Sequence, residues 1–245
     1  MKTALVTGAI GGIGRAIVKK FLKDGYFVIG QFNKNLSGKD EFISELEKEG
    51  LSDCFFAVQC DFTDMGAVEK MIDAICKDFK HIDVLVNNAG AGLYKLITQT
   101  TEKEWDDLFN INMKSAFVIT NGVLGGMIDR KSGAIINVSS MWGQVGASME
   151  VCYSASKGAM IAYTKALAKE VAPSGITVNC VCPGVIDTPI NARFSKEEML
   201  ELKEQTPLGR IGNPEDVAEL VFFLSQKGAS YITGQVVTCD GGFSL

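Results

Sequence analysis

Residues 2–22 of this 245-residue chain read KTALVTGAIGGIGRAIVKKFL, and this stretch decides the fold. Its first part, residues 2–7, is a short apolar run with β-branched side chains, which predicts a buried strand. The apolar residues of 15–22 recur at helical spacing. The glycines between strand and helix allow a tight turn whose backbone can approach a pyrophosphate at the helix N-terminus. An ordinary flexible turn is the alternative, so the prediction of a dinucleotide-binding unit needs support from elsewhere in the chain.

The rest of the chain alternates between strand and helix patterns. This alternation predicts one α/β domain, a doubly wound (Rossmann) fold over residues 1–245 with a seven-stranded parallel sheet and right-handed crossovers. Ligands of such sheets bind beyond the carboxyl ends of the strands. Strands are expected at 2–7, 26–31, 54–60, 82–87, 133–140, 176–182 and 234–239. Helices are expected at 12–24, 38–49, 64–78, 101–126, 152–172 and 214–226.

Composition excludes several classes of protein. A hydrophobic content of 47% with 5 prolines excludes a largely disordered chain. The formal net charge of −5 argues against a surface for nucleic acid or for an anionic membrane. No apolar stretch approaches the roughly 20 residues of a membrane span, and the first residues enter a strand directly, which leaves no room for a signal peptide. We therefore expect a cytoplasmic protein.

Metal chemistry is not expected. The seven cysteines contain no Cys-x-x-Cys pair, and His81 is the single histidine. A zinc site normally draws on four such ligands at characteristic spacing, so the prediction is that the chain binds no metal and keeps its thiols reduced.

Tyr153, Lys157 and Ser140 predict chemistry at a carbonyl group. On a helix, Tyr153 and Lys157 share one face because they are four residues apart. A free phenol has a pKa of about 10, and a neighbouring ammonium lowers that pKa toward the working range. Ser140 ends the strand expected at 133–140 and offers a hydroxyl to the same place. Taken alone, such a Tyr–Lys pair also arises by chance, and paired serines are often a turn or a helix cap.

The motifs together carry a resemblance. In order and spacing the chain resembles the classical short-chain dehydrogenase/reductase family over essentially all 245 residues. The segments that carry it are Thr7-Gly8-x-x-x-Gly12-x-Gly14, Asn87-Asn88-Ala89-Gly90, Asn112, Ser140, Tyr153-x-x-x-Lys157 and Pro183-Gly184.

The resemblance implies a catalytic tetrad of Asn112, Ser140, Tyr153 and Lys157. Tyr153 would exchange a proton with the substrate oxygen, and Ser140 would polarise and orient the carbonyl. Lys157 would hold the nicotinamide ribose and lower the pKa of Tyr153. Asn112 would hold a water that links Lys157 to solvent.

The resemblance also implies a nicotinamide dinucleotide as cofactor. Its expected contacts are Gly8, Gly12, Ile13, Gly14, Asn33, Lys34, Asp61, Phe62, Asn88, Ala89, Gly90, Tyr153, Lys157, Pro183, Gly184, Ile186 and Thr188. Asp61 is expected at the adenine amine, Ile186 at the carboxamide and Thr188 at the pyrophosphate.

NADP is favoured over NAD, which remains the alternative. The strand near 26–31 ends without the carboxylate that binds the ribose 2′-hydroxyl in NAD enzymes, whereas Asn33 and Lys34 could donate to a 2′-phosphate. Against this, Ile10-Gly11 supplies no basic side chain where many NADP members have arginine. Lys34 could also be an ordinary surface lysine.

Within the family the chain looks most like the 3-oxoacyl-(acyl-carrier-protein) reductases of fatty acid biosynthesis. That likeness implies reduction of a 3-oxoacyl thioester, with acyl carrier protein as a possible partner. Arg130-Lys131 could add to a basic docking patch, although Ser174 stands where many of these enzymes have arginine. An alcohol, sugar or steroid dehydrogenase is the enzyme alternative, and a dinucleotide-binding sensor without turnover is the alternative of another class.

Two further expectations concern assembly and the substrate. Residues 187–213 correspond to the mobile substrate lid of the family, and their polar middle, 195–205, could form a short surface helix. The resemblance also implies a homotetramer in which the helices at 101–126 and 152–172 pack against copies of themselves.

Overall fold

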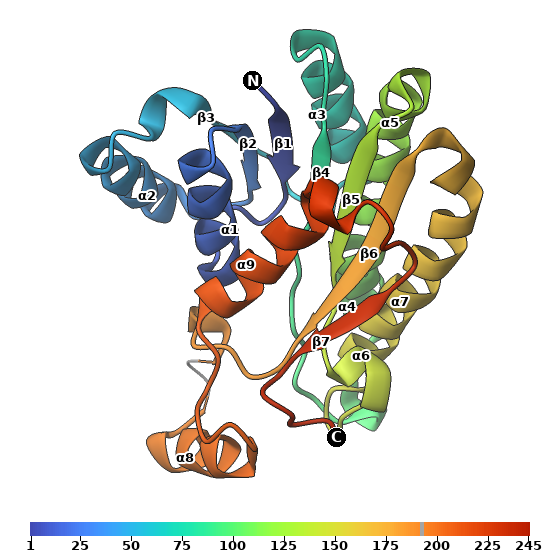
Figure 1. The fold of residues 1–245 in the computed structure, drawn as a ribbon. Coiled ribbons are helices and arrows are strands. Elements are labelled where there is room, and N and C mark those ends of the chain that lie inside the picture. The colour runs from blue at the N-terminus through green and yellow to red at the C-terminus, as the bar shows by residue number, and fades with distance from the viewer. Residues whose placement is uncertain (192–193) are drawn as a thin grey trace.

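The computed structural model describes residues 1–191 and 194–245 and contains the parallel sheet that the sequence predicts. In this part of the chain, seven strands lie in the order β3-β2-β1-β4-β5-β6-β7, and each neighbouring pair is parallel (Figure 1). The strands are β1 (Thr3–Val6), β2 (Phe27–Phe32), β3 (Phe55–Gln59), β4 (Val84–Asn87), β5 (Gly133–Val138), β6 (Ile176–Pro183) and β7 (Val236–Cys239).

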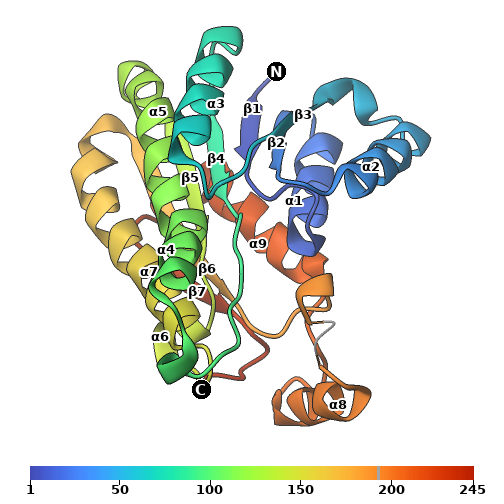
Figure 2. The ribbon, with the colours of Figure 1, turned by 180° about the vertical axis from the view of Figure 1, so that it is seen from behind.

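Helices cover both faces of the sheet (Figures 1 and 2). One face carries α1 (Gly12–Lys23), α2 (Leu36–Lys48) and α9 (Pro214–Ser225). The other carries α3 (Met65–Asp78), α5 (Ser115–Arg130) and α7 (Val151–Val171). Short helices α4 (Glu102–Phe109) and α6 (Trp142–Val145) lie beside α7, and α8 (Lys196–Gln205) protrudes below the sheet in Figure 1.

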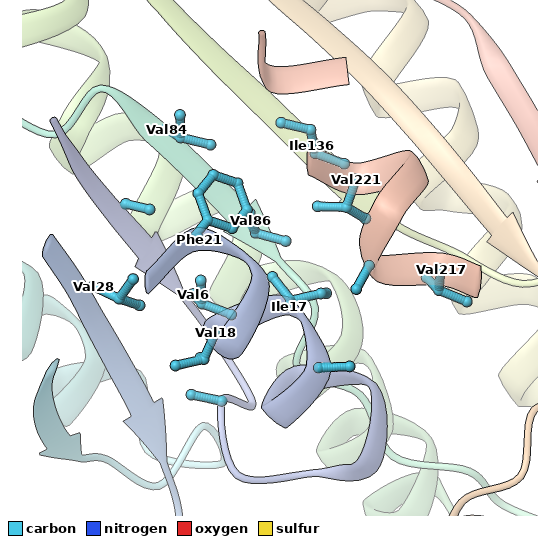
Figure 3. Packing of buried hydrophobic residues seen from close by; sticks show 14 of the residues in the cluster. Val6, Ile17, Val18, Phe21, Val28, Val84, Val86, Ile136, Val217 and Val221 are labelled. Carbon is cyan, nitrogen blue, oxygen red and sulfur yellow. The ribbon is translucent and has the colours of Figure 1, made fainter. Parts of the chain in front are cut away.

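The strands alternate their side chains between two apolar cores. Val84 and Val86 of β4 join the core under α1 and α9, whereas Leu85 between them joins the core under α3 and α5. This period of two is the geometry of a strand, and burial on both faces explains why a central strand such as β4 is largely apolar along its length. Figure 3 shows Phe21 of α1 and Val221 of α9 packed over the same side of the sheet.

One predicted helix differs from the structure. The sequence predicts a single helix over 101–126, whereas the chain winds as α4, a π-helix at Asn110–Lys114 and then α5, which continues to Arg130. A π-turn adds a residue to the turn and changes the direction of the side chains within it. Asn112 lies in this turn and is fully buried.

The strand order fixes where a ligand can bind. The chain runs outward from β1 through β2 and β3 on one side and from β4 through β5 and β6 on the other. The connections therefore diverge between β1 and β4, and this divergence opens a crevice at the carboxyl ends of the strands. Of the expected lid, 187–213, residues 192–193 lie outside the described part of the chain.

The polar middle of that segment is a helix, as the sequence indicates. Ser195 and Glu198 form a reciprocal capping box at the start of α8. Among the described residues, none of the helices combines the length and the apolar character that crossing a bilayer requires.

Candidate active site

The glycine turn after β1 has little room for side chains. Gly8 has φ +64°, a left-handed conformation that favours glycine, and a Cβ there would lie 2.9 Å from Ala89 Cα. A Cβ on Gly14 would overlap Gly8 O. These two glycines therefore allow the turn to close tightly against the chain that follows β4.

Two polar side chains hold this turn in place. Thr7 Oγ1 accepts hydrogen bonds from the backbone N–H groups of Asn88 (3.0 Å) and Ala89 (2.9 Å). Asn88 Nδ2 donates to Thr7 O (2.9 Å) and to Gly8 O (3.3 Å). The segments at 7–14 and 87–90, far apart in sequence, thus meet at the divergence of the strands.

Gln31 is a third anchor that the sequence analysis missed. It is buried at the end of β2, where Oε1 accepts from Gly8 N (3.0 Å) and Nε2 donates to Cys60 O (2.8 Å). The signal was a lone amide in the otherwise apolar run FVIGQF, since a buried amide needs hydrogen-bond partners.

A groove runs over these segments. Its first cavity, of about 760 Å³, lies along the glycine turn and α1 and is lined by Gly8, Ile10, Gly11, Gly12, Ile13, Gly14, Arg15, Phe32, Asn33, Lys34, Asn35, Glu41, Asn88, Ala89, Gly90, Thr188 and Pro189. A second cavity, of about 560 Å³, shares Ile13, Asn88, Gly90 and Thr188 with the first and continues to Ser140, Tyr153 and Lys157.

The groove fits an extended dinucleotide. The N-terminus of α1 points its free N–H groups at the first cavity, which suits a pyrophosphate. A Cβ on Gly90 would lie 3.1 Å from Lys157 Nζ, so a side chain at this position would fill the passage between the cavities. The absence of a side chain at Gly90 leaves room for a ring beside Lys157.

Tyr153 and Lys157 lie on one face of α7, as their spacing predicts. Lys157 Nζ lies 5.9 Å from the centroid of the Tyr153 ring and donates to Val138 O (2.9 Å). The amine is almost completely buried, and this burial lowers the pKa of Lys157 to about 8.

The two serines after β5 have different partners. Ser139 Oγ donates to Lys157 O (2.7 Å), so this hydroxyl fixes α7 against the sheet. Ser140 Oγ accepts from Trp142 N (3.2 Å), and Ser140 lines the second cavity together with Tyr153. Its hydroxyl proton can therefore point toward a bound carbonyl, and this geometry favours Ser140 over Ser139 as the carbonyl donor.

Asn112 lies close to these residues, but its side chain does not line either cavity. Its Oδ1 accepts from Ala91 N (2.8 Å), and its Nδ2 donates to Ala91 O (3.0 Å) and to Ser156 Oγ (2.9 Å). Asn112 thereby joins the segment after Gly90 to α7. Ser156, one residue before Lys157, is a further contributor that the sequence analysis did not single out.

Lys34 and Asp61 form one ion pair at the outer end of the groove. Lys34 Nζ lies 3.1 Å from Asp61 Oδ2, and Lys34 is 81% exposed. Hydrogen bonds from the backbone and hydroxyl of Thr63 lower the pKa of the Asp61 carboxyl to about 2, and Lys34 adds to this effect. Asp61 lines neither cavity, and the side chain of Phe62 is buried in the core, so only its backbone could reach a ligand.

The segment after β6 closes the second cavity from the other side. Pro183, Gly184, Ile186 and Thr188 all line it. Ile186 O accepts from Asn191 Nδ2 (2.7 Å), and Thr188 packs directly against Gly12 of the glycine turn. The structure thus brings the predicted contacts from 8–14, 88–90 and 183–188 into one groove.

Arg130, a candidate member of a basic docking patch, lies away from this groove within one chain. Arg130 Nη2 donates to Ile82 O (2.8 Å), and Arg130 Nη1 lies 3.2 Å from His81 Nδ1. His81 and Ile82 precede β4 and lie at the amino ends of the strands, whereas the two cavities lie beyond the carboxyl ends of the strands.

Known proteins resemble the chain in sequence and in fold. The family model for the short chain dehydrogenases matches residues 2–199. The uncharacterized oxidoreductase YmfI of Bacillus subtilis (strain 168) is 38% identical over 247 residues, 99% of this chain and 98% of its own. The 3-oxoacyl-[acyl-carrier-protein] reductase FabG of Thermotoga maritima is 38% identical over 245 residues, 100% and 98% of the two chains.

A solved structure agrees with these relatives. The crystal structure of a putative gluconate dehydrogenase from Agrobacterium tumefaciens superposes with a TM-score of 0.92 at 28% identity and covers 99% of this chain and 96% of its own. The chain therefore belongs to the short-chain dehydrogenase family, and it is an NAD(P)-dependent dehydrogenase/reductase.

Proposed function

We propose that the protein uses NADP(H) to reduce a 3-oxoacyl thioester to the 3-hydroxyacyl thioester. The observation that carries this proposal is the convergence of Ser140, Tyr153 and Lys157 on a cavity continuous with the groove along the glycine turn. Full-length similarity to relatives named 3-oxoacyl-[acyl-carrier-protein] reductase supports the substrate class. This activity would place the enzyme in fatty acid biosynthesis, in the cytoplasm, with acyl carrier protein as a possible partner.

The mechanism assigns one task to each residue of the site. A bound nicotinamide supplies the hydride for the carbonyl carbon. The Tyr153 hydroxyl donates its proton to the carbonyl oxygen, so hydride and proton together convert the ketone to the alcohol. The Ser140 hydroxyl donates a hydrogen bond to the same oxygen and stabilises the charge that develops there.

Lys157 and Asn112 support Tyr153 and the surrounding backbone. The Lys157 ammonium, held by Val138 O, stabilises Tyr153 as it loses its proton. The hydrogen bonds of Asn112 hold the backbone of Ala91 against Ser156 of α7. They support a role for Asn112 in positioning these two segments, in addition to the binding of a water.

Preference for NADP rests on the end of β2. This strand ends at Phe32, and Asn33 and Lys34 follow it along the wall of the first cavity. Neither residue is acidic, and a 2′-phosphate would offer the Lys34 ammonium a more highly charged partner than Asp61. Both residues thus favour the phosphorylated cofactor.

A second candidate is the oxidation of a hydroxylated, sugar-like substrate. Glu150, a buried acid in the wall of the second cavity, favours it because a carboxylate can accept hydrogen bonds from hydroxyls. The likeness to a putative gluconate dehydrogenase agrees with it. A sensor without turnover is disfavoured by the presence of the proton-transfer residues.

A substrate panel assayed with NADPH and with NADH tests the proposal. We expect oxidation of NADPH, followed by its absorbance, with acetoacetyl thioesters, and slower oxidation of NADH. The proposal would be overturned if no thioester were reduced with either cofactor while hydroxyketones were reduced or sugar acids oxidised. That outcome would favour the second candidate.

A further inference from the structure

Trp142 forms part of the wall of the second cavity, two residues after Ser140. Its backbone N–H donates to Ser140 Oγ (3.2 Å), so this residue begins beside the proposed carbonyl donor. A rigid aromatic side chain at this place limits the bulk of the groups that a ketone can carry near its carbonyl. A single methylene in an apolar pocket changes kcat/KM by about tenfold or more. The position of the Trp142 ring therefore bears directly on specificity.

Phe243 supports this ring from a distant part of the chain. The two ring centroids lie 5.8 Å apart and the ring planes meet at 87°, the edge-to-face arrangement that aromatic pairs favour. Figures 1 and 2 show the segment after β7 beside α6, the short helix that begins at Trp142. Phe243 lines neither of the two cavities of the groove, so it contacts the indole from outside the substrate site.

A second contact holds the same helix. Gln144, also in α6, donates from Nε2 to Thr238 Oγ1 of β7 (2.8 Å). The strand β7 and the segment after it therefore hold α6 at two points, one polar and one aromatic. Loss of the Phe243 ring would leave the bond of Gln144 in place, so α6 would keep an anchor while the indole of Trp142 lost its support.

The backbone around Phe243 is fixed by a local set of hydrogen bonds. The Asp240 carboxylate accepts from Gly242 N (2.9 Å), Ser244 N (2.8 Å) and Ser244 Oγ (2.6 Å). Gly242 has φ +87°, a left-handed conformation that favours glycine. The residues on both sides of Phe243 are thus anchored, and the backbone places the Phe243 ring against Trp142.

The same turn contacts the expected lid. Gly241 O accepts from Leu208 N (3.1 Å), and a Cβ on Gly241 would lie 2.7 Å from Thr206 Cγ2. These two lid residues follow α8, whose Leu202 lines the second cavity. The segment 240–244 therefore lies against both α6 and the end of the lid, which fixes Phe243 relative to the rest of the substrate site.

We propose that Phe243 is a positioning residue that sets the size of the substrate group accepted beside Trp142. Removal of the Phe243 ring leaves space behind the indole, and surrounding groups fill such a space only in part. The indole can then withdraw into it, and the cavity accepts a bulkier ketone. This inference rests on the proposed function only in placing a carbonyl at Ser140 and Tyr153, and it holds for thioesters and for simpler ketones alike.

Three β-keto esters measure the size of the accepted group. Ethyl acetoacetate is the reference, ethyl 4-methyl-3-oxopentanoate is branched beside the ketone, and tert-butyl acetoacetate is branched beyond the ester. The measured quantity is the kcat/KM of each branched ester relative to that of the reference. We expect Phe243→Ala to raise this ratio by about fivefold or more for one branched ester, which identifies the side of the substrate that faces Trp142. A loss of folded enzyme alone would lower all three kcat/KM values by the same factor and leave both ratios unchanged.

Further substitutions assign the effect to the ring contact. Phe243→Tyr keeps the ring and is expected to keep the wild-type ratios. Trp142→Phe is expected to raise the ratio for the same ester, and Phe243→Ala added to it should have little further effect, because the two changes act on one contact. Phe56→Ala is the matched control and should keep the wild-type ratios. It also removes a ring contact, with Phe79 at 5.6 Å between centroids, but Phe56 lies on β3 at the opposite edge of the sheet from β7.

Fluorescence reports on the indole directly. The chain has two tryptophans, so Trp105→Phe leaves Trp142 as the single emitter. In that background, Phe243→Ala should shift the emission to longer wavelength and increase quenching by acrylamide, because one edge of the indole loses its cover. Phe56→Ala should change neither the emission nor the quenching.

The outcomes separate this role from the proposed function. If Phe243→Ala leaves both ester ratios unchanged, or if its effect multiplies fully with that of Trp142→Phe, Phe243 does not act through the indole, and the proposed function is unaffected. If the ester ratios respond while the N-acetylcysteamine thioester of acetoacetate is not reduced, the role stands and the proposed function fails. If Phe243→Ala does not fold, Phe243→Leu, which keeps apolar volume without the ring, decides by the same ratios.

Discussion

Lys157 Nζ lies 5.9 Å from the centroid of the Tyr153 ring and donates a hydrogen bond to Val138 O at 2.9 Å. Burial there lowers the pKa of the amine to about 8. The amine is therefore protonated below this pH and loses its charge as the pH rises through it. The charge that stabilises Tyr153 is lost over the same range.

This titration predicts the pH dependence of the reaction. The kcat/KM for ketone reduction, which reports groups of the free enzyme, should fall as the pH rises through about 8. Lys157→Arg keeps a positive charge at all these pH values, so its residual activity should fall only at higher pH. A pH profile of both proteins checks this. An unchanged fall in the arginine variant would assign the titration to another group.

Tyr153→Phe removes the proposed proton donor and keeps the ring beside Lys157. Turnover should drop by about 100-fold or more, the usual range for a lost general acid. Cofactor affinity, measured by fluorescence titration of the reduced dinucleotide, should change little because the glycine turn and α1 are untouched. Near-wild-type turnover in this variant would remove Tyr153 from its proposed role.

Ser139 and Ser140 are expected to respond differently to the same substitution. Ser140→Ala should lower kcat by about 100-fold or more with little change in thermal stability, since the proposed role of this hydroxyl is at the carbonyl. Ser139→Ala deletes the buried hydrogen bond from the Ser139 hydroxyl to Lys157 O, at a cost of about 0.5–1.5 kcal/mol in the free energy of unfolding. Denaturant unfolding and steady-state kinetics of both variants measure the two effects. A large kcat loss confined to Ser139→Ala would reverse the assignment.

The fold was predictable because its signals are local. Buried parallel strands are continuous apolar runs, and helices have their own spacing, so the alternation along the chain determined the sheet. The neighbourhood of Ser140, Tyr153 and Lys157 was predictable for a related reason. Tyr153 and Lys157 share a helix, and Ser140 follows a strand at the same edge of the sheet.

Other features depend on contacts that no local pattern encodes. The π-turn around Asn112 and the strained conformation of Met149 are fixed by tertiary packing rather than by propensity. Lys34 follows β2 and Asp61 follows β3, so their ion pair joins two segments that are distant in sequence. From the sequence, the two residues could only be predicted as separate cofactor contacts. Glu150 had no signal, because an acid beside a helix start is ordinarily a solvent-exposed residue.

Lys34→Ala tests the choice of cofactor. Loss of the ammonium should weaken NADPH binding by about tenfold and leave NADH binding nearly unchanged, because only NADPH has the 2′-phosphate. Lys39→Ala is a suitable control, since Lys39 lies near the start of α2, close in sequence to Lys34, but forms an ion pair with Asp40. Dissociation constants for both dinucleotides measure the effect. Equal weakening of the two would identify Lys34 as an ordinary surface lysine.

The outer surfaces of α5 and α7 lead to a prediction about assembly. Phe117 of α5 and Val151 of α7 are 48% and 44% exposed, on the helices that the family resemblance assigns to self-association. We expect the protein to sediment as a homotetramer and Phe117→Glu to give smaller species, because a buried unpaired charge destabilises an interface. Phe56→Glu is the matched control, since Phe56 is equally exposed, at 48%, but lies on the edge strand β3. A wild-type monomer, or a tetramer that survives Phe117→Glu but not Phe56→Glu, would contradict an interface formed by these helices.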